Sequence, residues 1–253
     1  MLTNEARHPE RIIPDEVPPG ILALHLKRYV FASQWCQGKK VLDVACGAGY
    51  GAHYLAHMAD RVVGVDISEE AIAYAVQHYA SPNLCFELMD ARYLALKDET
   101  FDVVCSFETI EHLDGVDTYL HEVVRVLKSE GVLIVSTPNA TKTTLHPDNP
   151  FHQQEWSAVD FRDLLRGFFG EVAMYGQTRR RTRLNAFVKQ LDFLALRSRI
   201  APQWLVRAGA HAIGTRTTTD LTLEDIVIIP ENLSQATEIV AVCSQSCHPL
   251  GLS

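Results

Sequence analysis

The chain has 253 residues, of which 47% are hydrophobic and 21% are charged, and its formal net charge is −8. These proportions exclude a disordered, collagen-like or low-complexity chain and indicate a folded globular protein with a substantial core. The longest apolar runs are far shorter than the roughly 20 residues that a membrane-spanning helix needs, and the first residues lack a signal-peptide pattern.

Apolar runs alternate with helical patterns along most of the chain. Because parallel strands buried on both faces are continuously apolar, this pattern predicts an α/β protein with a doubly wound sheet and helices on both faces. The predicted helices are Ile21–Trp35, Tyr50–Met58, Glu69–Tyr79, Val116–Leu127 and Trp156–Phe168. The predicted strands are Val41–Cys46, Arg61–Asp66, Leu84–Leu88, Asp102–Phe107, Gly131–Ser136, Glu171–Tyr175 and Glu238–Cys243.

The charge is unevenly distributed. Residues 178–216 contain nine Lys or Arg side chains and one acidic residue, Asp192, so this segment carries +8 and leaves −16 on the rest of the chain. The segment also interrupts the strand–helix alternation. We therefore predict a basic helical insertion over residues 178–236, between the last two strands.

Six cysteines, at positions 36, 46, 85, 105, 243 and 247, form no CxxC pair and show no zinc-ligand spacing. We interpret them as small buried side chains in a reducing compartment, and we expect a cytoplasmic protein without a metal site.

The first predicted strand enters a glycine-containing turn, VLDVACGAG, and continues as a helix. In doubly wound folds this junction binds nucleotide-like ligands, because glycine allows a tight turn and a close approach of the backbone. Gly47, Gly49 and Ala52 also satisfy the dinucleotide fingerprint, which leaves NAD open as a ligand.

Three acidic residues at strand ends distinguish the possible ligands. Asp43 precedes the glycines and would disfavour a pyrophosphate but favour a cationic amino group. Asp66 ends the second strand, where it could accept hydrogen bonds from ribose hydroxyls. Asp90 follows the third strand, where it could accept one from an exocyclic amine. Together they favour S-adenosylmethionine over NAD.

Five motifs in fixed order extend over residues 41–139: VLDVACGAG, VVGVDIS, LMDA, FDVVCSFETIEHL and LKSEGVLIVSTPN. In these motifs the chain resembles the class I S-adenosylmethionine-dependent methyltransferases, in the small-molecule group with ubiquinone-pathway and glycan- or sugar-modifying members. The resemblance implies S-adenosylmethionine as cofactor and a seven-stranded Rossmann-like sheet of order 3-2-1-4-5-7-6, with the seventh strand antiparallel.

The resemblance also implies roles for individual residues. Asp43 and the backbone of residues 45–49 would hold the methionine moiety, Asp66 the ribose, and Asp90 with Ala91 the adenine edge. Ala45 replaces the usual first glycine, a substitution we expect to be tolerated at a negative φ. The full expected cofactor-binding set is Arg28, Tyr29, Asp43, Ala45, Cys46, Gly47, Gly49, Asp66, Ile67, Asp90, Ala91 and Phe107.

A hydroxyl acceptor needs a general base, whereas a neutral amine needs much less assistance. Glu111 and His112 follow the fourth strand, and the pKa of an unperturbed histidine lies near 6.5. His152, on the proline-rich loop after the fifth strand, is a rival base or a substrate-binding residue. Packing or capping roles are the alternatives for both histidines.

The segment before the first strand is expected to cover the cofactor. His25, Arg28 and Tyr29 share one face of the predicted helix, and Arg28 could reach the methionine carboxylate. We therefore divide the chain into a cofactor-binding domain, residues 1–177 and 237–253 with residues 1–38 as a lid arm, and the insertion, residues 178–236.

The basic insertion suggests the sign of the charge on the acceptor. It favours a small anionic acceptor, such as a nucleotide-linked sugar or phosphorylated glycan. A homodimer or intramolecular contact and a membrane-surface helix are alternatives. Nucleic acid is disfavoured by the acidic remainder and by the absence of an NPPY-type tetrad after the fourth strand.

The sequence thus predicts an enzyme that methylates a small molecule, with a sugar-type or anionic hydroxyl as the favoured acceptor. N- or C-methylation of a secondary metabolite or quinone-like precursor is the alternative. An NAD-dependent oxidoreductase and a non-catalytic cofactor-binding protein are the alternatives from other functional classes.

Overall fold

The computed structural model describes residues 11–180, 218–230 and 233–244. Its α-helices are α1 (Pro19–Ala32), α2 (Tyr50–Ala56), α3 (Glu69–His78), α4 (Val116–Val126) and α5 (Ala158–Arg166). Its strands are β1 (Lys40–Val44), β2 (Arg61–Asp66), β3 (Leu84–Leu88), β4 (Phe101–Phe107), β5 (Leu127–Pro138), β6 (Glu171–Arg179), β7 (Ile226–Ile229) and β8 (Glu238–Ser244). Each predicted helix and strand is present, with ends that differ by a few residues.

The strands form one sheet of order β3-β2-β1-β4-β5-β8-β6-β7. Strands β1 to β5 pair in parallel, while β8 pairs antiparallel with both β5 and β6. The expected doubly wound fold and the antiparallel last strand are therefore confirmed. The sheet has eight strands rather than seven, because the apolar run Ile226–Ile229 pairs with the end of β6 as an extra edge strand.

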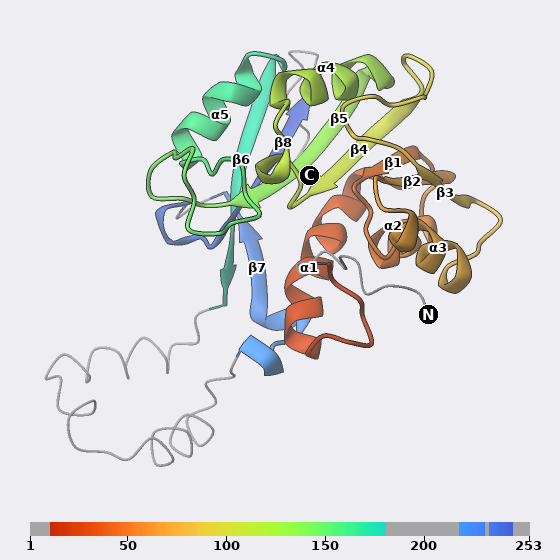
Figure 1. Cartoon of the computed structure of the whole chain (residues 1–253), viewed down its shortest axis with the longest axis horizontal. Coiled ribbons are helices and arrows are strands. Elements are labelled where there is room, and N and C mark those ends of the chain that lie inside the picture. Colours follow the sequence, from red (N-terminus) through yellow and green to blue (C-terminus); the bar gives the residue numbers. More distant parts are fainter. Residues whose placement is uncertain (1–10, 181–217, 231–232, 245–253) are drawn as a thin grey trace, which may run out of the picture.

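Alternate residues of the central strands belong to two hydrophobic cores on opposite faces of the sheet. In β1, Leu42 and Val44 belong to the core under α4 and α5, whereas Val41 belongs to the core under α1 and α2. Figure 1 shows α4 and α5 on one side of the sheet and α1 to α3 on the other. This three-layer arrangement is what the continuous apolar strands predicted.

Local capping signals explain where two helices begin. The Ser68 hydroxyl accepts from Ala71 N at the start of α3, and the Ser157 hydroxyl accepts from Asp160 N at the start of α5. Each contact satisfies a backbone donor that has no partner within the helix. The Ser157 cap makes α5 start at Ala158 rather than at the predicted Trp156.

Helix α1 packs tightly over the first turn of α2. A Cβ on Gly51 would lie only 1.9 Å from the Tyr29 ring, so the ring occupies the space that any side chain at this position would need. The close approach brings the Arg28 and Tyr29 end of α1 next to the glycine turn after β1. The helix predicted to cover the cofactor therefore lies beside the cofactor loop.

Only part of the predicted insertion belongs to the described residues. Residues 218–230 and 233–236 form short 3-10 turns and β7. Most of the basic segment, residues 181–217, lies outside the described residues, so its predicted helical character stays a prediction. Among the helices that the structure describes, none is long and apolar enough to cross a membrane.

Candidate cofactor and acceptor site

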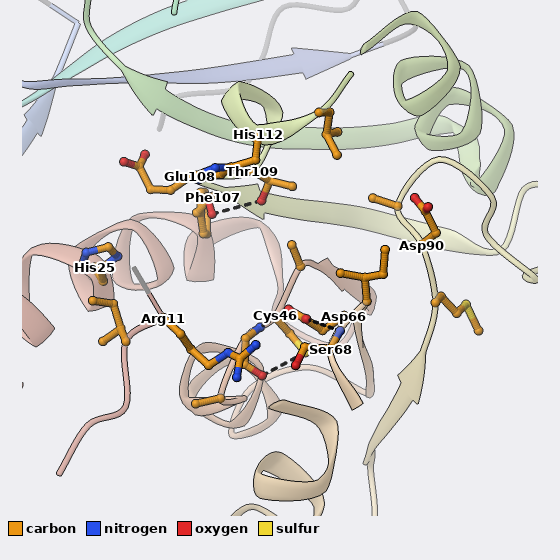
Figure 2. A pocket seen from close by; sticks show the side chains of 18 of the residues that line it. Arg11, His25, Cys46, Asp66, Ser68, Asp90, Phe107, Glu108, Thr109 and His112 are labelled. Atoms are coloured by element: carbon orange, nitrogen blue, oxygen red, sulfur yellow. Dashed lines mark hydrogen bonds between the residues drawn. The ribbon is translucent and has the colours of Figure 1, made fainter. Parts of the chain in front are cut away.

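A cavity of about 700 Å³ opens at the carboxyl ends of β1, β2 and β4 (Figure 2). Doubly wound proteins bind their ligands at this end of the sheet. Its wall is formed by segments far apart in sequence: Arg11 and Ile12, the second half of α1, the turns after β1, β2, β3 and β4, and Gln153 of the loop after β5. The wall includes every expected cofactor-binding residue except Asp43 and Gly49.

The turn after β1 has an unusual backbone. Gly47 and Gly49 have φ values of +54° and +84°, which glycine adopts without strain. Ala45 has a φ of +59°, so our expectation of a negative φ is wrong. The alanine occupies the left-handed region, where a Cβ costs roughly 1–2 kcal/mol relative to its usual conformations. The turn is therefore strained at the residue that replaces the usual glycine.

Asp66 connects this turn to the start of α3. Its Oδ2 accepts from Gly47 N and its Oδ1 accepts from Ser68 N, both at 2.9 Å. Each carboxylate oxygen can accept more than one hydrogen bond, so both can also accept from a ligand. Asp66 lines the cavity, and its expected contact with ribose hydroxyls stays a prediction.

Asp90 is held in a fixed orientation by Arg92. Arg92 Nη2 lies 2.6 Å from Asp90 Oδ2, and Arg92 N and Nε donate to Oδ1. These contacts keep the pKa of Asp90 below its usual value. The carboxylate therefore stays ionised as an acceptor in the cavity wall, beside Ala91.

Asp43 lies behind the glycine turn and does not line the cavity. It is fully buried, and its carboxylate oxygens lie 3.3 and 3.2 Å from the Tyr29 hydroxyl. Burial raises its pKa to about 8, although the hydrogen bond from Tyr29 opposes this shift. The direct ligand contact expected of Asp43 is therefore not supported, because its side chain faces α1 rather than the cavity.

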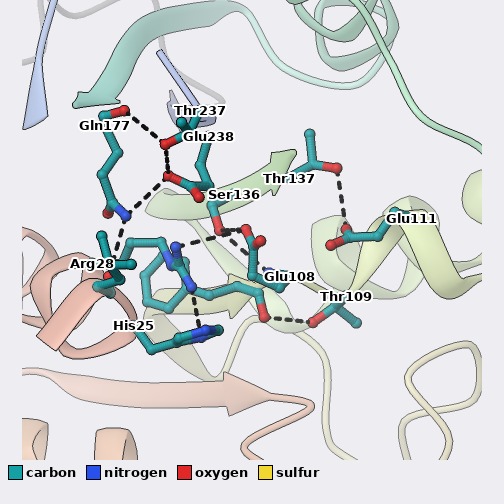
Figure 3. Close-up of polar contacts among 12 residues, drawn as sticks. His25, Arg28, Glu108, Thr109, Glu111, Ser136, Thr137, Gln177, Thr237 and Glu238 are labelled. Atoms are coloured by element: carbon teal, nitrogen blue, oxygen red, sulfur yellow. Dashed lines mark hydrogen bonds and ion pairs between the residues drawn. The ribbon is translucent and has the colours of Figure 1, made fainter. Parts of the chain in front are cut away.

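Arg28 is a buried cation in the cavity wall. Its Nη2 lies 2.8 Å from His25 Nδ1, and its Nη1 lies 3.9 Å from Glu108 Oε1 (Figure 3). Burial, and then the nearby Arg28 charge, lower the pKa of His25 to about 3, so the neutral ring accepts from the guanidinium. Among the described residues, Arg28 Nε has no hydrogen-bond partner although it is buried.

Glu108 is a cavity residue that the sequence reasoning did not select. It follows β4 with a φ of +52°, and Ser136 Oγ donates to its Oε1 at 2.7 Å. A non-glycine residue in this conformation requires support from its surroundings, and such strain often occurs at functional sites. Its place directly after a central strand was the only signal in the sequence.

The three predicted catalytic residues lie together, Glu111 and His112 in the turn after β4 and His152 on the loop after β5, but only His112 lines the cavity. His112 and His152 meet edge to face, with ring centroids 4.9 Å apart. Glu111 is buried and accepts from the Thr137 hydroxyl at 3.1 Å. Burial and the neighbouring Glu108 carboxylate raise its pKa well above the usual value, so Glu111 favours the protonated form.

The same three side chains are the candidate metal ligands in the described part of the chain. Glu111, His112 and His152 each offer one ligand atom, and these atoms lie within 4.8 Å of one another. The two nitrogens of His152, however, lie 2.6 Å from Glu155 Oε1 and 2.9 Å from Asn149 Nδ2. We therefore interpret the three residues as a hydrogen-bonded cluster rather than a metal site. Metal titration can test this interpretation.

Comparison with known proteins identifies the fold. Residues 42–135 match the protein family described as a methyltransferase domain. The chain contains a class I S-adenosylmethionine-dependent methyltransferase domain. The methyltransferase family predicted from the ordered motifs is thereby confirmed, and the first relative described next confirms S-adenosylmethionine as the cofactor.

Two curated relatives resemble the methyltransferase domain over different lengths. A probable S-adenosylmethionine-dependent methyltransferase of Mycobacterium tuberculosis is 38% identical over 176 residues, which is 66% of this chain and 62% of that protein. A ubiquinone biosynthesis O-methyltransferase of Bartonella quintana is 36% identical over 104 residues, which is 40% of this chain and 42% of that protein. The chain thus matches less than two thirds of the length of either relative.

A solved structure extends the likeness to the whole fold. A Thermotoga maritima protein described as an S-adenosylmethionine-dependent methyltransferase, possible histamine N-methyltransferase, has a TM-score of 0.60. The match covers 89% of this chain and 93% of that chain at 18% sequence identity. The likeness supports the fold of the methyltransferase domain. A shared fold does not identify the methyl acceptor, which must be inferred from the side chains of the cavity.

Proposed function

We propose that this chain transfers a methyl group from S-adenosylmethionine to a hydroxyl group of a small-molecule acceptor. The observation that carries the proposal is a single cavity whose wall contains both the cofactor-loop residues and His112. A volume of about 700 Å³ lies within the usual range for small-molecule sites. Donor and acceptor could therefore meet in one cavity, where the protein can align the methyl group with the acceptor.

The residues on the cofactor side fit S-adenosylmethionine. Asp66 presents two carboxylate oxygens for the ribose hydroxyls, and Asp90 beside Ala91 presents an acceptor for the adenine amine. Ile67 is 69% exposed at the cavity wall, where it would flank the adenine. The unpartnered Nε of the buried Arg28 fits the methionine carboxylate, because a buried guanidinium nitrogen without an acceptor is costly.

The residues on the acceptor side fit a hydroxyl group. S-adenosylmethionine supplies an electrophilic methyl group on a sulfonium, so the protein must orient the acceptor and remove its proton. His112 Nδ1 lies 2.9 Å from the Phe151 carbonyl oxygen, which accepts a hydrogen bond and leaves the lone pair of the neutral ring on Nε2. We assign His112 as the general base, and Glu108 as a hydrogen-bond acceptor that orients the substrate.

We propose a sugar, glycan-type or otherwise anionic acceptor. The nine basic side chains of residues 178–216 support a negatively charged acceptor. Residues 178–236 would then form the wall on the acceptor side. Arg179 and Arg180, at the described edge of this segment, are exposed. A contact between two copies of the chain is the alternative use of the same charge.

A cytoplasmic location is part of the same proposal. Five cysteines in the described part of the chain are free thiols, as expected in a reducing compartment.

Two measurements test the function. Calorimetry should detect binding of S-adenosylhomocysteine and none of NAD; the reverse would favour an oxidoreductase. Labelled S-adenosylmethionine is then incubated with nucleotide sugars, saccharides, phenolics and amines. Transfer to a hydroxyl would support the proposal, and transfer to nitrogen or carbon would correct the acceptor atom. Cofactor binding without transfer to any of these acceptors would favour a non-catalytic binding protein.

A further inference from the structure

The loop after β5 docks against the 3-10 turn Ile110–His112. Gln153 N donates to the Glu111 carbonyl oxygen at 2.7 Å, and the Phe151 carbonyl oxygen accepts from His112 Nδ1 at 2.9 Å. Because a carbonyl oxygen can only accept, the second contact requires that the neutral His112 ring carry its proton on Nδ1. The loop thus determines which His112 nitrogen has the lone pair.

His152, on the same loop, is itself held from both sides. Glu155 Oε1 lies 2.6 Å from its Nδ1, and Asn149 Nδ2 lies 2.9 Å from its Nε2. The carboxylate accepts from Nδ1 and the amide donates to Nε2, so His152 has the same tautomer as His112. Because both nitrogens are engaged and His152 does not line the cavity, it is poorly placed to take a proton from an acceptor.

The peptide group that joins Phe151 to His152 contains the carbonyl oxygen that holds His112. Asn149 fixes this peptide group directly, because His152 N donates to the Asn149 carbonyl oxygen at 3.2 Å, and it also fixes the preceding peptide group, whose Phe151 N donates to Asn149 Oδ1 at 3.1 Å. The His112 and His152 rings also meet at 83°. Anchoring the His152 ring therefore anchors the acceptor of the His112 Nδ1 hydrogen bond.

We propose that His152, held by Asn149 and Glu155, is a positioning residue that fixes the tautomer and orientation of His112. Its catalytic consequence rests on the proposed function, whereas the tautomer can be measured without any acceptor. Failure of the methyl-transfer assay would therefore leave the structural part of the proposal testable.

The tautomer is measured with ¹⁵N-histidine-labelled full-length chain by two-bond nitrogen–proton spectra, with His112 assigned by its absence in His112→Gln. We expect a protonated Nδ1 and an unprotonated Nε2 on His112 in the unmodified chain. His152→Ala should shift His112 toward the other tautomer or a mixture. His152→Gln, whose amide can donate to Glu155 and accept from Asn149, should retain the original tautomer. His146→Ala, an exposed histidine on the same loop, is the matched control.

The kinetic part uses any acceptor found in the screen. We expect His152→Ala to lower kcat about ten- to a hundredfold and to move the acid limb of the kcat–pH profile, with the KM for S-adenosylmethionine unchanged. His152→Gln should restore most of the activity. An unchanged His112 tautomer together with an unchanged pH profile in His152→Ala would overturn the proposal.

Two further outcomes have defined meanings. If His152→Ala does not fold, Asn149→Ala replaces it, and an unaltered His112 tautomer in Asn149→Ala would count against the proposal. Spectra are also recorded before and after dialysis against EDTA, and during titration with Zn²⁺. Loss of the His112 and His152 tautomers on EDTA treatment would overturn the proposal, because His152 would then act as a metal ligand.

Discussion

The Tyr29 hydroxyl lies 3.3 and 3.2 Å from the two carboxylate oxygens of Asp43, and both residues are buried. The contact joins α1 to β1, directly beneath the cofactor turn. Strand alternation explains it, because Asp43 points to the same face of the sheet as Val41, the face that α1 covers. A carboxyl group that the sequence pattern assigns to the cofactor site therefore connects two elements of the scaffold.

This pair predicts a pH-dependent stability. Burial raises the pKa of folded Asp43 to about 8, whereas its ordinary value is 3.8. Between these values the folded chain keeps a proton that the unfolded chain has released, so the free energy of unfolding falls as pH rises. Asp43→Asn should remove this part of the dependence. Urea unfolding across the same pH range checks it, and parallel curves for both proteins would refute it.

The left-handed Ala45 predicts a stabilising substitution. Ala45→Gly should raise the free energy of unfolding by about 1 kcal/mol, because glycine adopts a positive φ without the steric cost of a Cβ. Ala48→Gly is the matched control in the same turn, since Ala48 is buried without a positive φ. It should be destabilising by about 0.5–1 kcal/mol. Urea unfolding of both variants distinguishes relief of strain from a general effect of glycine.

The buried Arg28 predicts which part of the cofactor it recognises. Arg28→Gln should weaken S-adenosylhomocysteine binding about 10- to 100-fold, the usual size of a charge-assisted hydrogen bond. Methylthioadenosine, which lacks the amino acid portion, should bind both proteins equally. Calorimetry with the two ligands tests the assignment. An equal loss for both ligands would indicate that Arg28 acts through the shape of the cavity.

Replacing Asp66 should weaken the binding of both S-adenosylhomocysteine and methylthioadenosine. Asp66→Asn leaves one carbonyl oxygen in place of two carboxylate oxygens, although Gly47 N and Ser68 N both need an acceptor. We expect affinity for S-adenosylhomocysteine and for methylthioadenosine to fall about tenfold or more. Asp60→Asn, at an exposed acid outside the cavity, should leave both affinities unchanged. Retained affinity in Asp66→Asn would remove Asp66 from the ribose site.

His112 predicts a loss of turnover without a loss of cofactor binding. His112→Ala should lower kcat about 10²- to 10⁴-fold with a hydroxyl acceptor, the usual contribution of a general base. S-adenosylhomocysteine affinity should change little. His57→Ala, at an exposed histidine directly after α2 and outside the cavity, is the control. Turnover that survives in His112→Ala would show that the acceptor needs no base or uses another one.

Much of the candidate site was predictable because strand ends can be located in a sequence. Asp66 and Asp90 follow apolar runs, and parallel strands bring their carboxyl ends to one edge of the sheet. Gly47 was equally predictable, because a ligand that approaches the backbone closely requires glycine in the turn after the first strand. These residues line the cavity as the strand pattern predicted.

The contacts of Arg28 could not be predicted from sequence patterns. Its nearest charged partner, Glu108, is 80 residues away in the chain, and the hydrogen-bonded pair of Gln177 and Glu238 lies beside the same site. Helical periodicity places Arg28 on a face of α1 but does not say which strand ends that face meets. The packing of α1 in the folded chain decides this, including the contact of Tyr29 with Gly51 and the hydrogen bond from Gln177 to the Leu24 carbonyl oxygen.

The sequence by itself determined the layered fold, since the alternation of apolar strands with amphipathic helices permits few other ways to bury both faces of a sheet. The tertiary structure decided which polar groups face the cavity. Asp43 is directed toward α1, Ala45 is forced into a positive φ, and the run Ile226–Ile229 becomes an extra edge strand. The spacing of buried residues within one helix or strand is local, so it can be recognised in the sequence. The partner of a polar side chain often lies on a distant segment, so it is known only once the chain has folded.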